Sequence, residues 1–570
     1  MKKMLATILA FTIVLGILAA CGTAGDAVDA VTGDTAAQAE QPAQGGQQQA
    51  EAPPAAGSRI EGGTLIAGGA IIDAQLAANN PFLPHGQIAI AILDYIYERL
   101  LFMNVVSGEL EPMLATGFEW SPDYLELIFT IREGVVWHDG APFGPDDVVF
   151  TFDILRDYPI FDRHALWSRL RNVRAEGNTV VFELYDVFLS LPFFMDEIRI
   201  VPKHLWQDLP DASLHLNPTP VGTGPFMWRT HNIGTDVQLD ANPNYYLGAP
   251  IADEMLFLLY NNTINLSLAL LNGDLHWAHG ISVQFVPEFR STPNAVLQNL
   301  PGLNVFVVNL NHEHELLADP VVRRAMAMAI NQYDLRTRVE HGVVFPQSIG
   351  FLPDGFGEFV SREAYETLDF DAAGAVELLE AAGYVRGSDG IFVAPNGSRL
   401  SFTYHNQTAS PSQQMAAGMI QQWLLNIGVE ILPRLGTGPE LTHLQQTGQF
   451  ELIQRHIIIP PDPIGALNSV FHSSMTAPTG YPTPGLNFFR YRNPVVDALL
   501  DEAASSTDTA RRIEIAHEIQ MILAEDTVFL PMYGTGVRIP HFRDQNVGGW
   551  RDDAPVIANR NVIHLYLTQQ

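Results

Sequence analysis

The feature that most constrains this chain is the position of its only cysteine. Cys21 stands alone among 570 residues, so no disulfide can form within one chain and packing must stabilise the fold. Two lysines at positions 2–3 and an uncharged apolar run over residues 5–18 precede it. That run is too short to span a bilayer stably, and this order of basic, apolar and small residues is typical of an export signal. We therefore predict that residues 1–20 form a signal peptide.

The residues around Cys21 predict a lipid anchor. Leu18-Ala19-Ala20-Cys21-Gly22 resembles the lipobox of bacterial lipoproteins, which implies that the Cys21 thiol receives diacylglycerol. Each methylene buried in the bilayer contributes about 0.8 kcal/mol, so such an anchor is stable. Residues 21–58 contain no aromatic residue and cannot offset their chain entropy by burial, so we expect a disordered tether. The expected location is extracytoplasmic, on the outer face of a cell membrane, either at the cell surface or in a periplasm.

The charge of the chain excludes several classes of partner. The formal net charge is −32 at pH 7, which opposes binding to the phosphate backbone of nucleic acids and to anionic lipid surfaces. No apolar run beyond the signal is long enough for a membrane helix. We expect contact with the membrane through the lipid alone. A body of this length is too large for one ordinary core, so two or three lobes are expected.

Strand-like and helical segments alternate along the body, which predicts an α/β fold with mixed sheets. Order is expected from Gly62-Gly63-Thr64 onward, at a turn entering a strand. Caps and breakers predict helices beginning at Pro145, Asp319, Asp371, Ser412, Asn493 and Thr509. Strands are expected at residues 125–132, 180–184, 305–309 and 400–404.

Catalytic and metal-binding motifs are weak. The sequence has neither a phosphate-binding loop nor a nucleophile elbow. His138-Asp139 lies between glycines, which favours a turn over a catalytic pair. His312-Glu313-His314-Glu315 offers two imidazoles without a third ligand, so a solvated loop is the better interpretation. We expect no enzyme activity, no metal and no cofactor. The remaining interpretation is a tethered body of several lobes, suited to enclosing a small solute.

Six segments in order resemble the family 5 extracellular solute-binding proteins of ABC importers, the peptide/nickel group. The most specific contains Trp137-His138-Asp139-Gly140 and continues into Asp146-Asp147-Val148. The others contain Gly222-Thr223-Gly224-Pro225 with Asn242-Pro243-Asn244-Tyr245-Tyr246, Asn272-Gly273-Asp274, the helix from Asp319, Ala381-Ala382-Gly383-Tyr384, and Arg490-Tyr491-Arg492-Asn493-Pro494. The glycines and prolines of these segments suit turns and their aromatic residues suit cores.

This resemblance implies a periplasmic-binding-protein-like fold, type II and similar to cluster C, with two main lobes around a cleft and an inserted smaller lobe. Lobe I would comprise residues 60–106, 217–302 and 525–570. The inserted lobe II would be 107–216 and lobe III 303–524. The solute would be enclosed between lobes I and III, and a monomer would deliver it to an ABC permease without chemical change.

The resemblance also implies candidate solute contacts. In peptide-binding members, an aspartate after a lobe III strand pairs with the peptide ammonium, whereas alignment on Asp462-Pro463 puts Ile459 at that position. Capture of a peptide by its N-terminus is therefore doubtful, and Asp462 is either a ligand residue or a turn residue. The other candidates are Asn406, Gln407, Trp277, His279, His456, Arg490 and Tyr491. Core packing is the alternative for Trp277, and surface exposure is the alternative for Arg490 and Tyr491.

A peptide or peptide-like solute is the leading hypothesis. An oligosaccharide of the β-glucan type is the alternative within the same class, favoured by the missing aspartate and by the tryptophans. A nickel chelate would need His279, His405 and His456. From other classes, a cell-surface hydrolase lacks a catalytic pair that we can name, and an adhesin or signalling receptor would have lost its importer.

Overall fold

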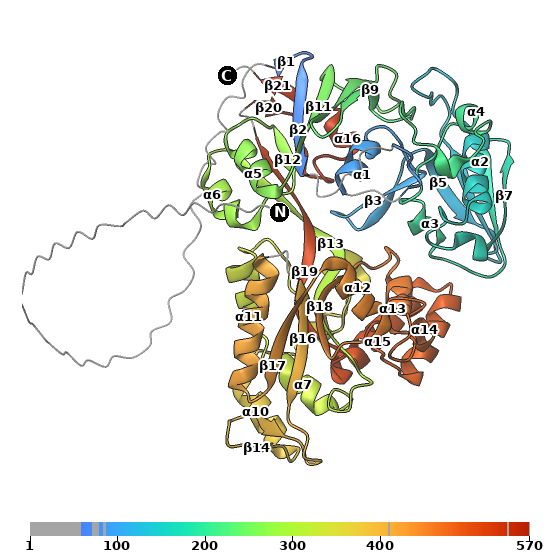
Figure 1. Ribbon diagram of the computed structural model, residues 1–570. Coiled ribbons are helices and arrows are strands. Elements are labelled where there is room, and N and C mark those ends of the chain that lie inside the picture. The colour runs from blue at the N-terminus through green and yellow to red at the C-terminus, as the bar shows by residue number, and fades with distance from the viewer. Residues whose placement is uncertain (1–58, 71–78, 84–86, 408–410, 544–545, 569–570) are drawn as a thin grey trace, which may run out of the picture. The chain divides into compact units, whose positions relative to one another are not determined.

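The computed structural model describes residues 59–70, 79–83, 87–407, 411–543 and 546–568 (Figure 1). Residues 55–570 belong to one compact unit. The predicted signal peptide, Cys21 and the predicted tether over 21–58 lie outside the described residues. In the described part of the chain, no helix is long and apolar enough to cross a membrane.

A ten-stranded mixed sheet is the backbone of the fold. Its strand order is β17-β16-β18-β13-β19-β12-β2-β11-β10-β9. β13 and β19 pair antiparallel at its centre, whereas β2 and β11 pair parallel. The bounds are β2 Thr64–Ala70, β9 Phe226–Asn232, β10 Asp236–Ala241, β11 Glu254–Tyr260, β12 Trp277–His279, β13 Ala295–Leu310, β16 Ser401–Gln407, β17 Glu430–Gly436, β18 Leu452–Ile457 and β19 Phe529–Phe542.

Two long strands connect the two halves of this sheet. β13 has 16 residues and β19 has 14, and they pair along most of their length (Figure 1). The register shifts between Pro301 and Val305, so Pro301-Gly302 forms an irregularity within β13 instead of ending it. The predicted strand 305–309 is therefore the last part of a longer strand. The expected border between lobes at 302/303 falls inside β13, and we call β13 and β19 the hinge strands.

Helices cover both faces of the half that holds β16–β18. Alternate residues of β13 point to opposite faces, with Phe306 and Val308 in one apolar cluster and Val305 and Val307 in the other. The first cluster includes α7 Pro320–Met328, α10 Ala372–Ala381 and α11 Pro411–Asn426. The second includes α13 Pro463–Phe471, α14 Pro494–Ser505 and α15 Thr509–Asp526.

The predicted helix starts are confirmed by their caps. Asp319 accepts a hydrogen bond from the Val321 amide at 2.9 Å, so α7 begins where the sequence indicates. Asp371 caps α10 through the Gly374 amide at 2.8 Å. Asn493 caps α14 through the Val495 amide at 3.0 Å.

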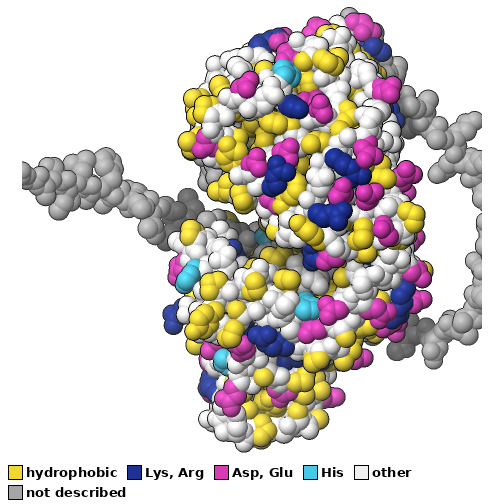
Figure 2. Space-filling view, turned by 90° about the vertical axis from the view of Figure 1, so that its right-hand side faces the viewer, with side chains coloured by type: hydrophobic (Ala, Val, Ile, Leu, Met, Phe, Trp, Pro, Cys, Tyr) yellow, Lys and Arg dark blue, Asp and Glu magenta, His cyan; other side chains and the backbone are white. Residues whose placement is uncertain are grey.

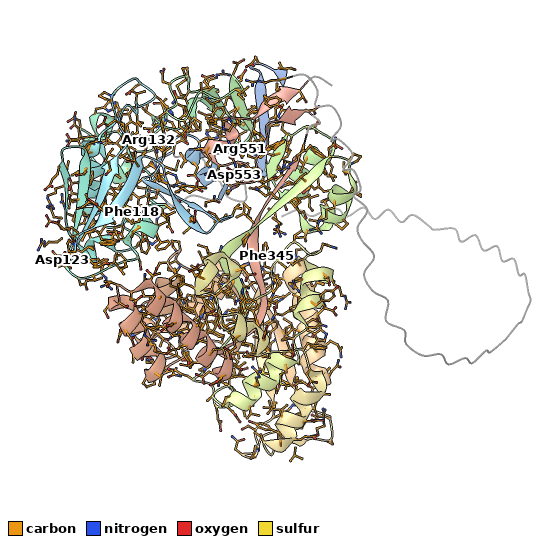
Figure 3. All side chains as sticks on the ribbon, turned by 180° about the vertical axis from the view of Figure 1, so that it is seen from behind. Phe118, Asp123, Arg132, Phe345, Arg551 and Asp553 are labelled. Atoms are coloured by element: carbon orange, nitrogen blue, oxygen red, sulfur yellow. The ribbon has the colours of Figure 1, made fainter. Side chains whose placement is uncertain are left out.

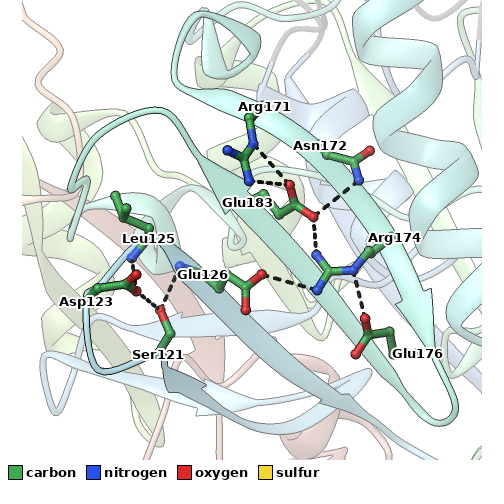
Figure 4. A network of polar contacts seen from close by, with 9 residues as sticks. All are labelled: Ser121, Asp123, Leu125, Glu126, Arg171, Asn172, Arg174, Glu176 and Glu183. Carbon is green, nitrogen blue, oxygen red and sulfur yellow. Dashed lines mark hydrogen bonds and ion pairs between the residues drawn. The ribbon is translucent and has the colours of Figure 1, made fainter.

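A separate four-stranded antiparallel sheet, in the order β5-β6-β8-β7, lies within the predicted lobe II. Its bounds are β5 Ala115–Trp120, β6 Glu126–Ile131, β7 Leu170–Glu176 and β8 Thr179–Leu184. α2 Pro145–Asp157 packs on one face through Phe152, which meets Phe182 edge to face. Ion pairs cover part of the other face (Figure 4). There Arg171 Nη2 lies 2.8 Å from Glu183 Oε2, and Arg174 bonds Glu126, Glu176 and Glu183.

The remaining elements are short. The other helices are α1 Gln87–Asp94, α3 Leu191–Phe194, α4 Lys203–Trp206, α5 Thr263–Leu271, α6 Val286–Ser291, α8 Gln332–Asp334, α9 Arg362–Glu366, α12 Gly438–Thr447 and α16 Asn559–Val562. The other strands are β1 Arg59–Ile60, β3 Leu101–Asn104, β4 Glu109–Pro112, β14 Val385–Arg386, β15 Phe392–Val393, β20 Val547–Gly548 and β21 Tyr566–Thr568. On the side that carries α2 and α14, arginine and carboxylate side chains are interspersed and the surface is hollowed at mid-height (Figure 2).

Candidate functional site

The recognisable sequence segments meet around the chain at residues 95–98. Gly222 and Gly224 pass so close to this chain that a Cβ on either would collide with the carbonyl oxygens of Ile96 or Tyr95. The His138 ring accepts a hydrogen bond from the Gly222 amide at 3.2 Å, and its Nε2 lies 3.0 Å from the Gly224 carbonyl oxygen. Burial lowers the pKa of His138 to about 4, so the ring is neutral at pH 7. These groups hold a turn in place.

Glu98 lies under this turn and is 1% exposed. Its Oε1 accepts hydrogen bonds from Tyr245 at 2.7 Å and Tyr246 at 3.1 Å, and its Oε2 accepts one from Thr223 at 2.9 Å. Burial raises the pKa of Glu98 to about 7, against the lowering effect of the donated hydroxyls. These segments therefore act as scaffold, as their residue types indicate.

Trp277 and His279 lie on β12 with one residue between them, so their side chains are on the same side of the strand. Trp277 is fully buried and meets Trp550 edge to face, so core packing describes most of its surface. The His279 ring contacts Phe257 at 5.2 Å between centroids, and burial lowers its pKa to about 4. His279 Nε2 lacks a hydrogen-bond partner among the described residues. The Tyr95 hydroxyl interacts with the side chain of Trp277. We call Tyr95, Trp277 and His279 the lobe I wall.

Asn406 and His456 share a face of the sheet on neighbouring strands. Tyr404 of β16 is paired with Leu452 of β18 in parallel, and both later residues follow at even spacing on the same side. Asn406 is 2% exposed, and its Oδ1 lacks a partner among the described residues. His456 is exposed and stacks on Phe306 at 4.2 Å between centroids. Because protein still surrounds much of its ring, the pKa of His456 falls to about 4, with smaller contributions from Arg455 and Arg538. Gln407 follows Asn406 at the end of β16, points to the other face and is half-buried.

Asp462 is a helix cap. It is fully buried, accepts a hydrogen bond from the Gly465 amide at the start of α13, and lies 3.4 Å from Arg512 Nη2. Its Oδ2 also accepts a hydrogen bond from Ser190 Oγ at 2.7 Å. Ser190 belongs to the predicted lobe II and Asp462 to lobe III, so this contact joins two lobes. Ile459 is 5% exposed and packs in an apolar cluster, where it offers a solute no polar atom.

Arg490 and Tyr491 lie in the interior, so surface exposure is the wrong description of them. Arg490 is 2% exposed and donates to the carbonyl oxygens of Gln446 and Tyr481 at 2.9 and 3.2 Å. Tyr491 is 3% exposed and its hydroxyl donates to Asp526 Oδ2. These hydrogen bonds hold the loop before α14 in place, so few polar atoms of Arg490 and Tyr491 can bind a solute in this conformation.

The three histidines that a nickel chelate would require have separate surroundings. His279 contacts Phe257 and His456 contacts Phe306. His405 lines a recess of about 520 Å³ together with His314 and Glu451. Among the described residues, no group of three histidine, cysteine or carboxylate side chains is arranged to hold a metal ion.

A group at the hinge strands was not found from the sequence. Arg538 on β19 is the register partner of Asn299 on β13. Arg538 Nη1 lies 3.8 Å from Glu340 Oε2, and Glu340 Oε1 accepts a hydrogen bond from Tyr533 at 3.0 Å. Tyr533 also contacts Phe306, on which His456 stacks. We call Asn299, Glu340, His456, Tyr533 and Arg538 the hinge cluster. Strand pairing brings Asn299, His456, Tyr533 and Arg538 together, and the turn after Leu335–Val339 adds Glu340, so no local motif carries that information.

Known proteins are similar to this chain in sequence and in fold. The family model described as bacterial extracellular solute-binding proteins, family 5 Middle, matches residues 109–477. A protein of Brucella ovis, named a candidate ABC transporter peptide-binding protein, is 28% identical over 417 residues, which cover 70% of this chain and 74% of that protein.

Solved structures give the same fold. A periplasmic oligopeptide-binding protein of an oligopeptide ABC transporter from Thermotoga maritima is 25% identical, with a TM-score of 0.79 over 88% of this chain and 99% of that one. A structure of the same Thermotoga protein with bound mannohexaose aligns at 23% identity, with a TM-score of 0.70 over 90% of this chain and 100% of that one. The latter likeness concerns the fold alone.

Proposed function

Because this chain belongs to family 5 of the bacterial extracellular solute-binding proteins, we propose that it is a lipid-anchored receptor that captures a peptide and delivers it to an ABC permease. The family itself is extracytoplasmic and binds solutes. The peptide and the importer are supported by the names of the Brucella and Thermotoga relatives. The lipid anchor is supported by the sequence around Cys21.

The observation that carries the proposal is a set of buried polar atoms without partners on both halves of the hinged sheet. His279 Nε2 lies on the lobe I wall, and Asn406 Oδ1 lies on the lobe III half. A buried polar atom without a hydrogen bond costs about 1–3 kcal/mol. A peptide offers alternating main-chain donors and acceptors, so it can satisfy atoms of both kinds at once.

Capture would proceed by closure at the hinge strands. A solute that bonds to both halves has a higher affinity for the closed arrangement, so it shifts the population toward that form. The Ser190–Asp462 contact supports this mechanism, because it links lobes II and III. The permease would then recognise the closed form, and no bond in the solute would be made or broken.

Thermal unfolding of the purified protein tests the solute class. We expect a mixed peptide pool to raise the unfolding midpoint, because ligand at a hundred times Kd adds about 2.7 kcal/mol. Asn406→Leu removes the unpartnered amide at similar volume and should reduce this rise. The matched control is Asn426→Leu at the end of α11, which should keep it. If β-glucan oligosaccharides alone raise the midpoint, the peptide is the wrong solute.

A second experiment tests the anchor. In the native host, the protein should be recovered in the membrane fraction, whereas Cys21→Ser should be recovered in the soluble extracytoplasmic fraction, since the thiol carries the lipid. Thr23→Ala lies outside the five lipobox residues and leaves the thiol, so it serves as the control and should be recovered in membranes. Recovery of Cys21→Ser in membranes at the wild-type level would contradict lipid attachment at this residue.

A further inference from the structure

We propose that Arg538 binds a carboxylate of the solute and that, together with Asn299, it recognises the carboxyl end of a peptide. The inference rests on the proposed function and adds the end by which the peptide is held. The two residues are register partners on the hinge strands, so they lie where both halves of the sheet meet.

The guanidinium of Arg538 has unused donors. Among the residues that the structure describes, it donates no hydrogen bond, and its Nη1 is shielded from solvent. By contrast, the buried Arg323 donates to four carbonyl oxygens, those of Leu317, Ala318, Asp526 and Thr527. A guanidinium has five N–H donors in a planar fork that matches a carboxylate. The side chain of Arg538 is 26% exposed, so a ligand can reach it.

Asn299 supplies the complementary acceptor. Its Oδ1 is buried without a partner among the described residues, directly across from Arg538 on the neighbouring strand. The last residue of a peptide presents both its carboxylate and its own amide N–H. The carboxylate suits the Arg538 fork and the N–H suits Asn299 Oδ1. An anion without such an N–H would pair with Arg538 but could not donate to Asn299 Oδ1.

The carboxyl groups of Asp94, Glu340 and Asp462 already have partners, which argues against capture of an ammonium by any of these three. Asp462 is bonded by Ser190 and Arg512. Asp94 is bonded by Arg99 and Arg199. Glu340 accepts from Tyr533. Arg538, by contrast, is a cation with unused hydrogen-bond donors, so an anionic group of the solute suits it.

Glu340 does not prevent this binding. Its Oε2 lies 3.8 Å from Arg538 Nη1, which is too far for a hydrogen bond and leaves the fork open. One arginine can serve two carboxylates in this protein, since Arg99 pairs with both Asp94 and Asp196. His456 is neutral at pH 7, so it adds an uncharged hydrogen-bonding group beside the site. Figure 3 shows Phe345 beside the hinge strands, where a Cβ on Gly536 would collide with the Phe345 ring.

Three forms of one mixed-sequence tetrapeptide pool test the inference. The forms are the free acid, the C-terminal amide and the N-acetylated acid, and retention by the purified full chain is measured by mass spectrometry. We expect the free acid and the N-acetylated acid to be retained alike. The amide should be retained at least tenfold less, because it lacks the charge that pairs with Arg538. Equal retention of all three forms overturns the inference and leaves the peptide receptor standing. Retention of none overturns both.

Substitution of Arg538 tests whether this residue causes the preference for the free acid over the amide. Arg538→Gln should lower affinity for the free acid at least tenfold and remove the preference over the amide. Arg171→Gln, on the outer face of the lobe II sheet, is the matched control and should change neither. Because Arg538→Gln leaves Glu340 without its cation, the double variant Glu340→Gln/Arg538→Gln is measured as well. If either variant at 538 keeps the wild-type preference for the acid, Arg538 does not bind the carboxylate.

Discussion

At the scale of single residues, Glu98 shows how a buried carboxyl group couples the scaffold to pH. Its pKa is about 7 in the folded chain and near 4.5 in the unfolded chain, so the folded state binds the proton more tightly. The stability that this group contributes is present below pH 4.5 and is lost as the pH rises to 7. Hydrogen bonds from the hydroxyl groups around Glu98 lower its pKa, but by less than burial raises it.

Glu98→Gln removes that titration. Between pH 5 and pH 8, the wild type should lose roughly 2–3 kcal/mol of unfolding free energy relative to the variant. Chemical denaturation at several pH values measures the difference, with Glu133→Gln, an exposed glutamate, as the control. Parallel pH profiles for wild type and Glu98→Gln would show that Glu98 is already ionised when folded at pH 5.

At the scale of elements, caps were predictable and long-range register was not. Asp319, Asp371 and Asn493 each act within three residues along the chain, so the sequence contains both partners of the bond. The sequence predicted only residues 305–309 of β13, whereas pairing with β19 extends the strand across Pro301-Gly302. The family resemblance made Asn406 and His456 candidates, whereas Asn299 and Arg538 come together only through the pairing of β13 with β19.

The start of α13 gives an element-scale prediction. Asp462→Ala removes the helix cap and leaves the buried Arg512 unpaired, so we expect a loss of about 3 kcal/mol or more in unfolding free energy. Ser190→Ala deletes only one hydrogen bond and should cost about 1 kcal/mol. Asp462→Asn keeps the cap and separates capping from charge. Equal losses for Asp462→Ala and Ser190→Ala would mean that neither the cap nor Arg512 matters.

At the scale of the whole molecule, burial keeps many histidines neutral. The pKa values of His138, His276, His279, His456 and His541 are lowered to about 4 and that of His312 to about 3, mainly by desolvation. Unfolding returns them to an ordinary value near 6.5, so they take up protons when the chain unfolds in mild acid. The stability tied to them is present above pH 6.5 and falls as the pH drops toward 4.

The expected consequence is lability to mild acid. Glu98 and Asp196, with pKa values raised by burial to about 7 and about 6, release protons on unfolding and act in the opposite direction. At pH 5.5 the net uptake should be about four protons, so stability should change by about 5 kcal/mol per pH unit there. Denaturation curves from pH 5 to 8 provide the slope. A flat profile would mean that water reaches these imidazoles in the folded state.

Fold and family were predictable over the whole molecule because the scaffold segments are local and numerous. The solute was not predictable, because its proposed contacts come from strands far apart in the sequence. Surface exposure, the alternative for Arg490 and Tyr491, was wrong because both residues lie inside. The central claim is that this family 5 protein captures peptides. Native mass spectrometry of the protein purified without added ligand tests it most directly. We predict bound species that fragment as peptides with free carboxyl ends, and a series of bound hexose oligomers would contradict the claim.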